Sequence, residues 1–256
     1  MDAKAQSFLR LLQIIDELRE KCPWDKKQTI ESIRHLTIEE TYELSDAILS
    51  GKADDIKKEL GDILLHIVFY ARIASETKKF DIVEVINTLC DKLIYRHPHI
   101  YGDVKAENEE QVKQNWEQLK QKEKNGNTSV LSGVPNSMPA LLKSYRIQEK
   151  ARAVGFDWEE PTQVYEKVKE ELNEFEEERK KGNTVNAEKE FGDVLFSLIN
   201  YARFIGINPE DALEQTNKKF IHRFNYMEEK VKASGKQISD CKLEELDLYW
   251  NEAKEK

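Results

Sequence analysis

Apolar residues recur at helical spacing through most of the chain. Between Phe8 and Glu20, for example, Leu11, Ile15 and Leu18 fall on one side of a helix. Similar periodicity, together with the positions of glycine, proline and capping residues, predicts further helices. We expect them at residues 8–20, 29–50, 54–77, 81–96, 107–122, 141–153, 163–180, 187–205, 209–234 and 243–254. The predicted fold class is therefore all-α.

The boundaries of the second and third helices follow from particular residues. Gly51 is expected to terminate the helix before it, because glycine readily adopts the left-handed conformation that ends a helix. Asp54 or Asp55 is expected to cap the helix that follows. The later part of that helix is apolar almost all round, which is typical of a buried helix.

One acidic pattern occurs twice in the chain. Residues 39–43 read E-E-x-x-E and residues 59–62 read E-x-x-D, and residues 170–174 and 190–193 repeat them. The offset is constant, because 170 − 39 and 193 − 62 both equal 131. The repeat predicts two tandem helical domains, each with a four-helix-type core. We place these domains at residues 1–124 and 138–256, with a linker rich in turn-forming residues at 125–137.

The acids of each copy border the apolar stripe of their helix. Residues three apart share a helical face, so Glu40 neighbours Glu43 and Glu59 neighbours Asp62. Carboxylates gathered beside a core repel one another and lose hydration, which is costly unless a cation binds. A single E-x-x-E is more often a solvated face, but two sets in register favour a site for a hard cation such as Mg²⁺. The predicted ligand sets are Glu40, Glu43, Glu59 and Asp62, and Glu171, Glu174, Glu190 and Asp193.

Basic residues are also repeated. Lys92 and Arg96 correspond to Lys219 and Arg223, since 219 − 92 and 223 − 96 both equal 127. Lysine and arginine four residues apart share a helical face and can hold phosphates, arginine as a fork and lysine as a point charge. Two surface cations would be the usual interpretation of one copy, but the duplication favours a function. In the same way Trp116 and Lys120 correspond to Trp250 and Lys254, because both offsets equal 134.

These motifs together resemble the MazG family of nucleoside triphosphate pyrophosphohydrolases, within the all-α NTP pyrophosphatase superfamily. The resemblance covers nearly the whole chain and has the two-copy layout of full-length bacterial MazG. Three further segments carry it: Cys22-Pro23-Trp24-Asp25-Lys26, Arg96-His97-Pro98-His99 and Val154-Gly155-Phe156-Asp157-Trp158. The acidic pattern alone would be shared with dimeric dUTPases and phosphoribosyl-ATP pyrophosphohydrolases.

The resemblance implies a reaction and a cofactor. The expected reaction is hydrolysis of a nucleoside triphosphate at the α–β phosphate bond, with Mg²⁺ or Mn²⁺ bound to the acids. It also implies that Lys167 contacts phosphate, that Trp250 or Trp116 and the neighbouring Lys120 bind the nucleotide, and that two chains form a homodimer. A buried anchoring role for the tryptophans stays equally open. Glu170 is either a base that positions water or a surface acid.

The two copies differ beside the E-x-x-D acids. His66 and Phe69 in the first copy correspond to Ser197 and Asn200 in the second, both at an offset of 131. Asn200 can hydrogen-bond a ligand carboxylate or a metal-bound water, whereas Phe69 cannot. The second copy is therefore expected to be the more active, with Glu170, Glu171 and Glu174 as its catalytic acids.

Composition excludes several other functions. The formal net charge of -9 disfavours a general nucleic-acid surface. The longest apolar run, residues 63–71, is much shorter than the roughly 20 residues of a membrane span, and the N-terminus shows no signal peptide. The three cysteines lack metal-ligand spacing and indicate a reducing cytosol. Two alternatives stay open: a non-catalytic helical scaffold, and a relative with a narrower substrate, such as dUTP or a damaged nucleotide.

Overall fold

The computed structural model describes residues 2–108, 111–112, 115–116, 119–120 and 129–255. Every regular element within these ranges is helical, which confirms the all-α prediction. The chain divides into two compact units, residues 1–105 and 106–256. The predicted helix at residues 107–122 and the start of the predicted linker lie partly outside the described residues. No described helix is long and apolar enough to cross a membrane.

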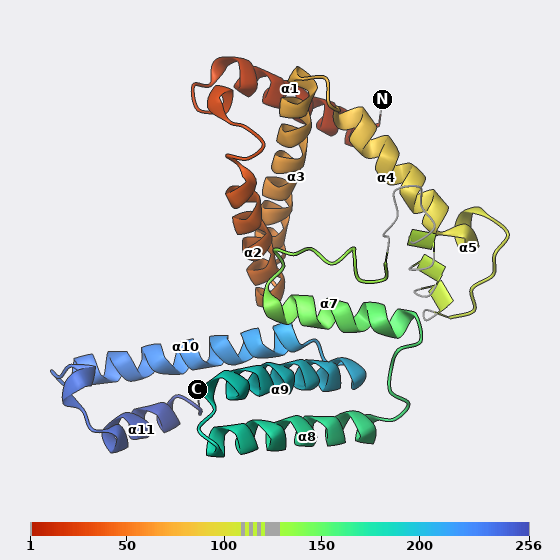
Figure 1. The fold of residues 1–256 in the computed structure, drawn as a ribbon. Coiled ribbons are helices and arrows are strands. Elements are labelled where there is room, and N and C mark those ends of the chain that lie inside the picture. Colours follow the sequence, from red (N-terminus) through yellow and green to blue (C-terminus); the bar gives the residue numbers. More distant parts are fainter. Residues whose placement is uncertain (1, 109–110, 113–114, 117–118, 121–128, 256) are drawn as a thin grey trace. The chain divides into compact units, whose positions relative to one another are not determined.

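Unit 1 is centred on one long helix, α3 (Ala53–Glu76). Helix α3 contacts α1 (Ala3–Lys21), α2 (Arg34–Ser50) and α4 (Ile82–Arg96), and lies along α2 in Figure 1. Two short elements complete the unit: η1 (Asp25–Lys27) and α5 (Pro98–Tyr101). Because only Gly51 and Lys52 separate α2 from α3, the two helices run antiparallel with their acidic segments facing each other.

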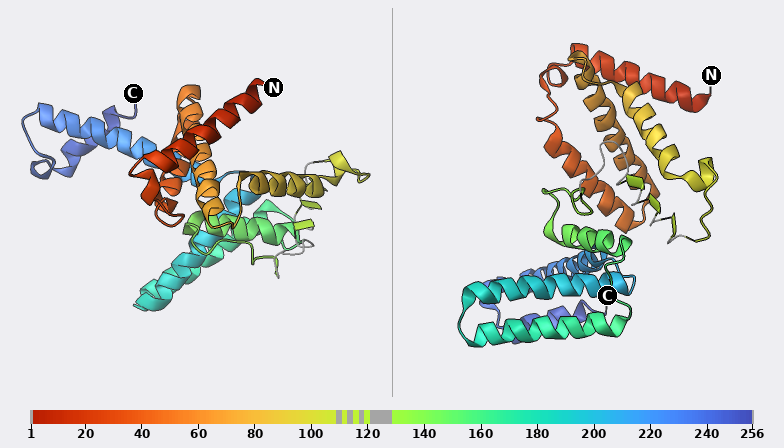
Figure 2. Two further views of the ribbon diagram at one scale, coloured as in Figure 1. Left: turned by 90° about the horizontal axis from the view of Figure 1, so that it is seen from above. Right: turned by 45° about the vertical axis from the view of Figure 1, so that its right-hand side comes forward.

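Unit 2 repeats this arrangement around α9 (Thr184–Phe204). Helix α9 contacts α7 (Ala140–Ala153), α8 (Pro161–Lys180) and α10 (Pro209–Ala233). Figures 1 and 2 show α8 and α9 side by side along their length. The chain then continues through η2 (Ile238–Asp240) to α11 (Leu243–Glu252), which packs on α10.

Local side-chain hydrogen bonds set several helix ends. At the start of α4, Asp81 accepts from the backbone N–H of Glu84, and the Glu84 carboxylate accepts from the N–H of Asp81. Gly51 ends α2 with a φ of 70°, as predicted. In this conformation glycine avoids the steric cost that a Cβ atom would bring.

Two predicted boundaries are wrong for local reasons. Helix α2 begins at Arg34 and not at residue 29, because the side chains of Thr29 and Ser32 each accept from the other's backbone N–H. This pair stabilises a turn that competes with the first turn of a helix. The N-cap of α3 is Lys52, and Asp54 and Asp55 lie in its first turn. Acids there interact favourably with the positive end of the helix dipole without capping it.

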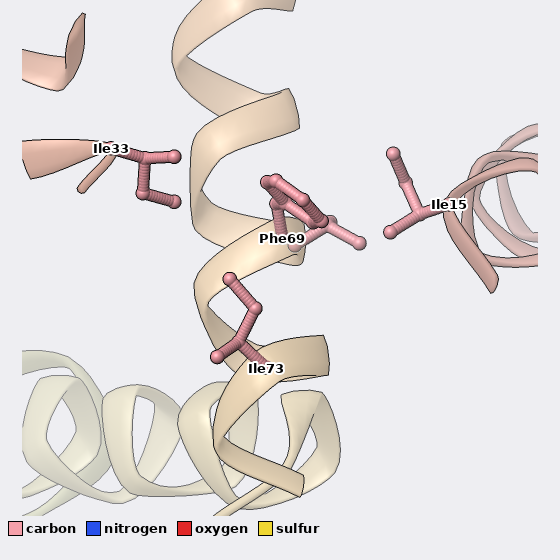
Figure 3. Close-up of a cluster of buried hydrophobic side chains, with 5 residues drawn as sticks. Ile15, Ile33, Phe69 and Ile73 are labelled. Carbon is pink, nitrogen blue, oxygen red and sulfur yellow. The ribbon is translucent and has the colours of Figure 1, made fainter. Parts of the chain in front are cut away.

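The core of unit 1 lies where the later part of α3 meets α1 and the segment before α2. It consists of Ile15, Ile33, Val68, Phe69 and Ile73. Figure 3 shows the Phe69 ring between Ile15 and Ile33. The prediction that this part of α3 is buried is confirmed, since most of the core comes from it.

The capping pair on α4 yields a stability prediction. Replacing Asp81 by Ala should lower the free energy of unfolding by about 1 kcal/mol, because the N–H of Glu84 loses its acceptor. Urea unfolding followed by circular dichroism measures this loss. Asp91→Ala on the exposed side of the same helix is the matched control and should change stability by no more than about 0.5 kcal/mol. Equal stability of the two variants would contradict a capping role.

Candidate functional site

The acids of unit 2 converge where α8 lies against α9. Carboxylate oxygens of Glu171 and Glu174 on α8 and of Glu190 on α9 all lie within 4.8 Å of one another. Glu171 is buried, Glu190 is half-buried and Glu174 is exposed. The antiparallel pairing explains the convergence, because it brings the end of one acidic motif opposite the start of the other.

Unit 1 holds a matching group. Oxygens of Glu40, Glu43 and Glu59 also lie within 4.8 Å of one another. Glu59 is only 6% exposed, and its Oε2 atom is buried without a hydrogen-bond partner among the described residues. A buried carboxylate oxygen without a partner is costly, and a bound cation would remove that cost. The donor set, carboxylate oxygens only, suits a hard divalent ion.

The fourth predicted ligand of each set lies beside the group of three. Asp62 is half-buried and contributes to raising the pKa of Glu40, whereas Asp193 is exposed and contributes to raising the pKa of Glu190. Neither aspartate supplies one of the oxygens that lie within 4.8 Å of one another. The structure therefore brings three of the four predicted acids together in each unit and leaves the aspartate at the edge.

Both acid groups have the electrostatics of cation sites. Desolvation, reinforced by the charges of Asp62 and Glu43, raises the pKa of Glu40. Desolvation, reinforced by Glu174 and Asp193, raises the pKa of Glu190. A raised carboxyl pKa means that the ionised form is disfavoured, so a bound cation would stabilise both groups.

A lysine contacts each acid group. The Nζ atom of Lys58 lies 2.9 Å from Glu59 Oε1, and Nζ of Lys167 lies 2.7 Å from Glu171 Oε1 and 2.8 Å from Glu170 Oε1. Hydrogen bonds to Glu170 and then Glu171 raise the pKa of Lys167, so it stays charged at neutral pH. Sequence reasoning selected Lys167 by resemblance and missed Lys58, although its position directly before Glu59 was a usable signal.

A cavity of about 550 Å³ adjoins the acids of unit 2. Glu171, Asp193 and Lys167 line one part of it. Most of the remaining lining is apolar, and it includes Leu131, Ile147, Phe156, Trp158, Val164 and Phe196. A cavity of this size, mainly apolar with a few charged groups, is typical of a small-molecule site.

An arginine network forms another part of the cavity wall. Arg203 on α9 donates two hydrogen bonds to the carboxylate of Asp157, 3.0 Å from Nη1 to Oδ2 and 2.5 Å from Nη2 to Oδ1. Its Nε and Nη2 atoms also donate to Oδ1 of Asn200. The Arg203 side chain is only 4% exposed. This bidentate pair fixes the loop that carries Trp158 against α9, and sequence reasoning did not predict it.

The structure gives Asn200 and Ser197 partners other than the acids. Both residues line the cavity with Asp193, on the side predicted from the sequence. However, Oδ1 of Asn200 accepts from Arg203, and Oγ of Ser197 donates to the backbone oxygen of Val194. These bonds stabilise the cavity wall and the helix. The predicted support of a metal site by Asn200 stays a prediction.

Of the two predicted phosphate-binding cations of α10, Arg223 lies beside an aromatic cluster. The guanidinium of Arg223 lies 5.9 Å from the centre of the Trp250 ring, and the rings of Phe220 and Trp250 are 5.0 Å apart. Among the described residues, the cavity lining includes Lys167 but not Lys219, Arg223 or Trp250.

The counterparts of these residues and of Lys254 in the first copy of the repeat are Lys92, Arg96, Trp116 and Lys120. Lys92 and Arg96 lie in the last two turns of α4, where Lys92 is exposed and Arg96 half-buried. Trp116 and Lys120 are half-buried and lie between residues outside the described ranges. The predicted roles of all four residues therefore stay predictions.

Paired acidic helices beside a cavity define an all-α protein with the features of a metal-dependent hydrolase. The sequence model of the MazG nucleotide pyrophosphohydrolase domain matches this chain twice, at residues 28–101 and 159–227. The chain belongs to the MazG nucleotide pyrophosphohydrolase family, as its motifs predicted.

Proteins similar to this chain support the family assignment along nearly its whole length. It is 45% identical over 250 residues to the nucleoside triphosphate pyrophosphohydrolase/pyrophosphatase MazG of Thermotoga maritima, covering 96% of this chain and 95% of that protein. It is 40% identical over 252 residues to the nucleoside triphosphate pyrophosphohydrolase of Escherichia coli K12, covering 96% of each. It is also 46% identical over 252 residues to the uncharacterized protein YabN of Bacillus subtilis, covering 97% of this chain and 52% of that protein.

The repulsion within the acid groups yields a prediction about stability. Because the pKa of Glu40 is raised in the folded chain, its contribution to stability is present at low pH and is lost as the pH rises through that pKa. At pH 7 the ionised side chain is therefore destabilising. Glu40→Gln should raise the melting temperature in EDTA and reduce the increase that Mg²⁺ produces. Thermal unfolding with and without Mg²⁺ measures both effects.

Glu20→Gln, at an exposed acid of α1, is the matched control for charge. This control should leave the increase caused by Mg²⁺ unchanged. A lower melting temperature for Glu40→Gln in EDTA would show that the ionised carboxylate is stabilising, contrary to the argument from repulsion.

Proposed function

We propose that this chain hydrolyses nucleoside triphosphates to the monophosphate and pyrophosphate. The observation that carries the proposal is the acid group of Glu171, Glu174 and Glu190 at the edge of a cavity of about 550 Å³. Similar proteins named as nucleoside triphosphate pyrophosphohydrolases support the same reaction. Water adds to one phosphorus of the α–β anhydride and gives up a proton, the bond from that phosphorus to the bridging oxygen breaks, and the departing phosphate group keeps that oxygen and the electron pair of the bond.

Glu171, Glu174, Glu190 and Asp193 would hold Mg²⁺, with Mn²⁺ as a substitute. Their oxygen donors and their mutual repulsion both support this assignment. When bound, the ion supplies charge neutralisation for the phosphates and a lowered pKa for the attacking water. Glu40, Glu43, Glu59 and Asp62 would hold an ion in unit 1 in the same way.

Lys167 is placed to bind the phosphates. Its ammonium group lies at the junction between the acids and the cavity, and its raised pKa keeps it charged. Glu170 is exposed and accepts a hydrogen bond from it, which supports a role in positioning this lysine. Lys219 and Arg223 on α10 and Trp250 on α11 are not among the described residues that line this cavity, so their predicted contacts to the phosphates and to the base stay predictions.

The nucleoside part of the substrate would enter the cavity. Its apolar lining suits a base and a sugar, while the charged residues at one part of it suit the phosphates. The Arg203–Asp157 pair keeps the wall near Trp158 in place before substrate arrives. The substrate would therefore lie with its triphosphate at the acids and its base towards α7 and the loop after it.

Exposed apolar stripes support a homodimer. On α9, Phe191, Leu195 and Leu198 are each more than two-fifths exposed, at the i, i+4, i+7 spacing of one helical face. Their counterparts on α3, at an offset of 131, are Leu60 and Ile67 with Leu64, and they are exposed to a similar extent. Large exposed apolar faces usually mark an interface. We propose that a second copy covers them, and that the enzyme works in the cytoplasm, as its scattered cysteines suggest.

Substrate assays distinguish the proposal from its alternatives. Purified protein would be incubated with Mg²⁺ and a panel of ribonucleoside and deoxyribonucleoside triphosphates that includes dUTP. Pyrophosphate and orthophosphate would be measured separately. Release of pyrophosphate from several substrates supports the proposal, and release from a single one supports a narrow relative. The absence of release from all of them would favour a scaffold.

Metal dependence is the first consequence of the acid site. EDTA should abolish pyrophosphate release, and Mg²⁺ or Mn²⁺ should restore it, because the site offers only hard oxygen ligands. The activity is measured after exhaustive dialysis and again after each ion is added. Ca²⁺ serves as a control for simple charge neutralisation. Undiminished pyrophosphate release in EDTA would contradict a metal-dependent mechanism.

The two acid sites should contribute unequally. Glu174→Gln should lower the rate of NTP hydrolysis by about 10–100-fold, which is a typical cost of disturbing a metal site. Glu43→Gln should leave most of the activity, because the cavity described for unit 2 adjoins only the second set of acids. Both variants are assayed on one NTP panel, with circular dichroism to show that they are folded. A larger loss from Glu43→Gln would reverse the assignment of the working site.

A further inference from the structure

Most of the residues that line the cavity of unit 2 have counterparts in unit 1. From the segment before α2 through α3, the offset is 131, as in the acidic motifs. For α1 and α7 it is 132, because α1 ends at Lys21, α7 ends at Ala153, and 153 − 21 equals 132. The two structures can therefore be compared position by position.

In unit 1 three of these counterparts, Phe69, Ile15 and Ile33, belong to the hydrophobic core. Phe69, which corresponds to Asn200, is 4% exposed and packs with Ile15 and Ile33. Ile15 and Ile33 correspond to Ile147 and Val164, which line the cavity of unit 2. Figure 3 shows the Phe69 ring lying between Ile15 and Ile33. The same framework is thus filled by a phenyl ring in one unit and is open beside an amide in the other.

A second position also differs between the units. Leu36 packs against the core of unit 1, and its counterpart, Lys167, lines the cavity of unit 2. The leucine at position 36 therefore stands where unit 2 has its proposed phosphate-binding lysine.

An arginine closes the same region of unit 1 from α1. The guanidinium of Arg19 lies 5.9 Å from the centre of the Phe69 ring, whereas its counterpart Ala151 lines the cavity. Arg19 is held in place, since its Nε atom lies 2.7 Å from Glu76 Oε1 and Nη1 donates to the backbone oxygens of Asp25 and Gln28. The ring is therefore covered by a side chain with fixed partners.

We propose that Phe69 is a specificity-determining residue that closes the nucleoside pocket of unit 1. With Leu36 and Arg19, it converts the pocket into core while the acids beside it persist. Unit 1 then binds no nucleoside, although its carboxylates converge as closely as those of unit 2. The inference rests on the proposed function of unit 2, because it takes the cavity there as the nucleoside site.

The first test places the ring in unit 2. The Asn200→Phe variant of the full chain should bind the α,β-methylene analogues of ATP, GTP, CTP and UTP about tenfold or more weakly than the natural chain, in the presence of Mg²⁺. Asn200→Ala is the matched control, because it also removes the acceptor of Arg203 but leaves the pocket open. We expect this control to retain clearly more affinity than Asn200→Phe. Inorganic tripolyphosphate, which lacks a nucleoside, should bind Asn200→Phe and the natural chain equally.

The second test opens the pocket of unit 1 in a chain whose unit 2 pocket is closed by Asn200→Phe. Adding Leu36→Lys and Phe69→Asn to Asn200→Phe should restore binding of the analogues, and adding Glu43→Gln should weaken it again. Circular dichroism verifies that each variant is folded. Because Phe69 is buried, Phe69→Leu with Leu36→Lys provides a milder variant in case the asparagine prevents folding, and it should restore binding in part.

The outcomes separate this inference from the proposed function. Nucleotide affinity of Asn200→Phe equal to that of the natural chain would overturn the inference, while pyrophosphate release by the natural chain would leave the proposed function intact. Equal losses in Asn200→Phe and Asn200→Ala would also overturn it, because the hydrogen bond and not the ring would then matter. A folded triple variant that binds no analogue, even after Arg19→Ala is added, would show that Phe69, Leu36 and Arg19 do not close the pocket. No analogue binding and no hydrolysis by the natural chain would refute the proposed function itself.

Discussion

Repulsion among carboxylates is the constraint on which the site of this chain depends. Glu171, Glu174 and Glu190 are held within 4.8 Å of one another beside a packed helix pair. Such an arrangement costs free energy, and desolvation, reinforced by the charges of Glu174 and Asp193, raises the pKa of Glu190. The short connection between two long helices fixes the acids opposite each other, and packing along α8 and α9 prevents them from separating. The fold therefore keeps the carboxylates of the proposed cation site assembled in advance.

Lysines moderate this repulsion without removing it. Lys167 pairs with Glu170 and Glu171, and Lys58 pairs with Glu59, so each cluster keeps one ammonium group in contact. Oε2 of Glu59 is nevertheless left buried without a partner among the described residues. A divalent ion carries more charge than an ammonium group and accepts several oxygen ligands at once, so it is the better partner for such a cluster. The lysine of unit 2 is then available for the phosphates.

The acid sites were predictable from sequence because their determinants are local. Three-residue spacing and a constant offset of 131 place the glutamates on facing helices, with no knowledge of tertiary structure. The cavity was not predictable in this way. It depends on contacts that α9 makes with α7 and with the loop after α7 that carries Asp157, both of which lie much earlier in the chain. The bond between Arg203 and Asp157 joins residues separated by 46 positions, and no spacing rule reveals it.

The difference between the halves was also detected in part. Comparison of the two copies within the sequence singled out Phe69 and Asn200, but it interpreted them as residues beside the metal. The structure places Phe69 in a core with Ile15, and Asn200 in a cavity wall bound to Arg203. The physical contrast is therefore between a filled and an open space. Side-chain volume in a tertiary contact decides it, and a helical wheel of one helix does not contain that information.

The most direct test of the central claim is to locate a bound ion. Crystals of the protein grown with Mn²⁺ would be measured near the manganese absorption edge, and an anomalous difference map would be calculated. We expect a peak bonded to oxygens of Glu171, Glu174 and Glu190. Saturating Mn²⁺ with no peak at these carboxylates, or with the ion held only by other residues, would contradict it.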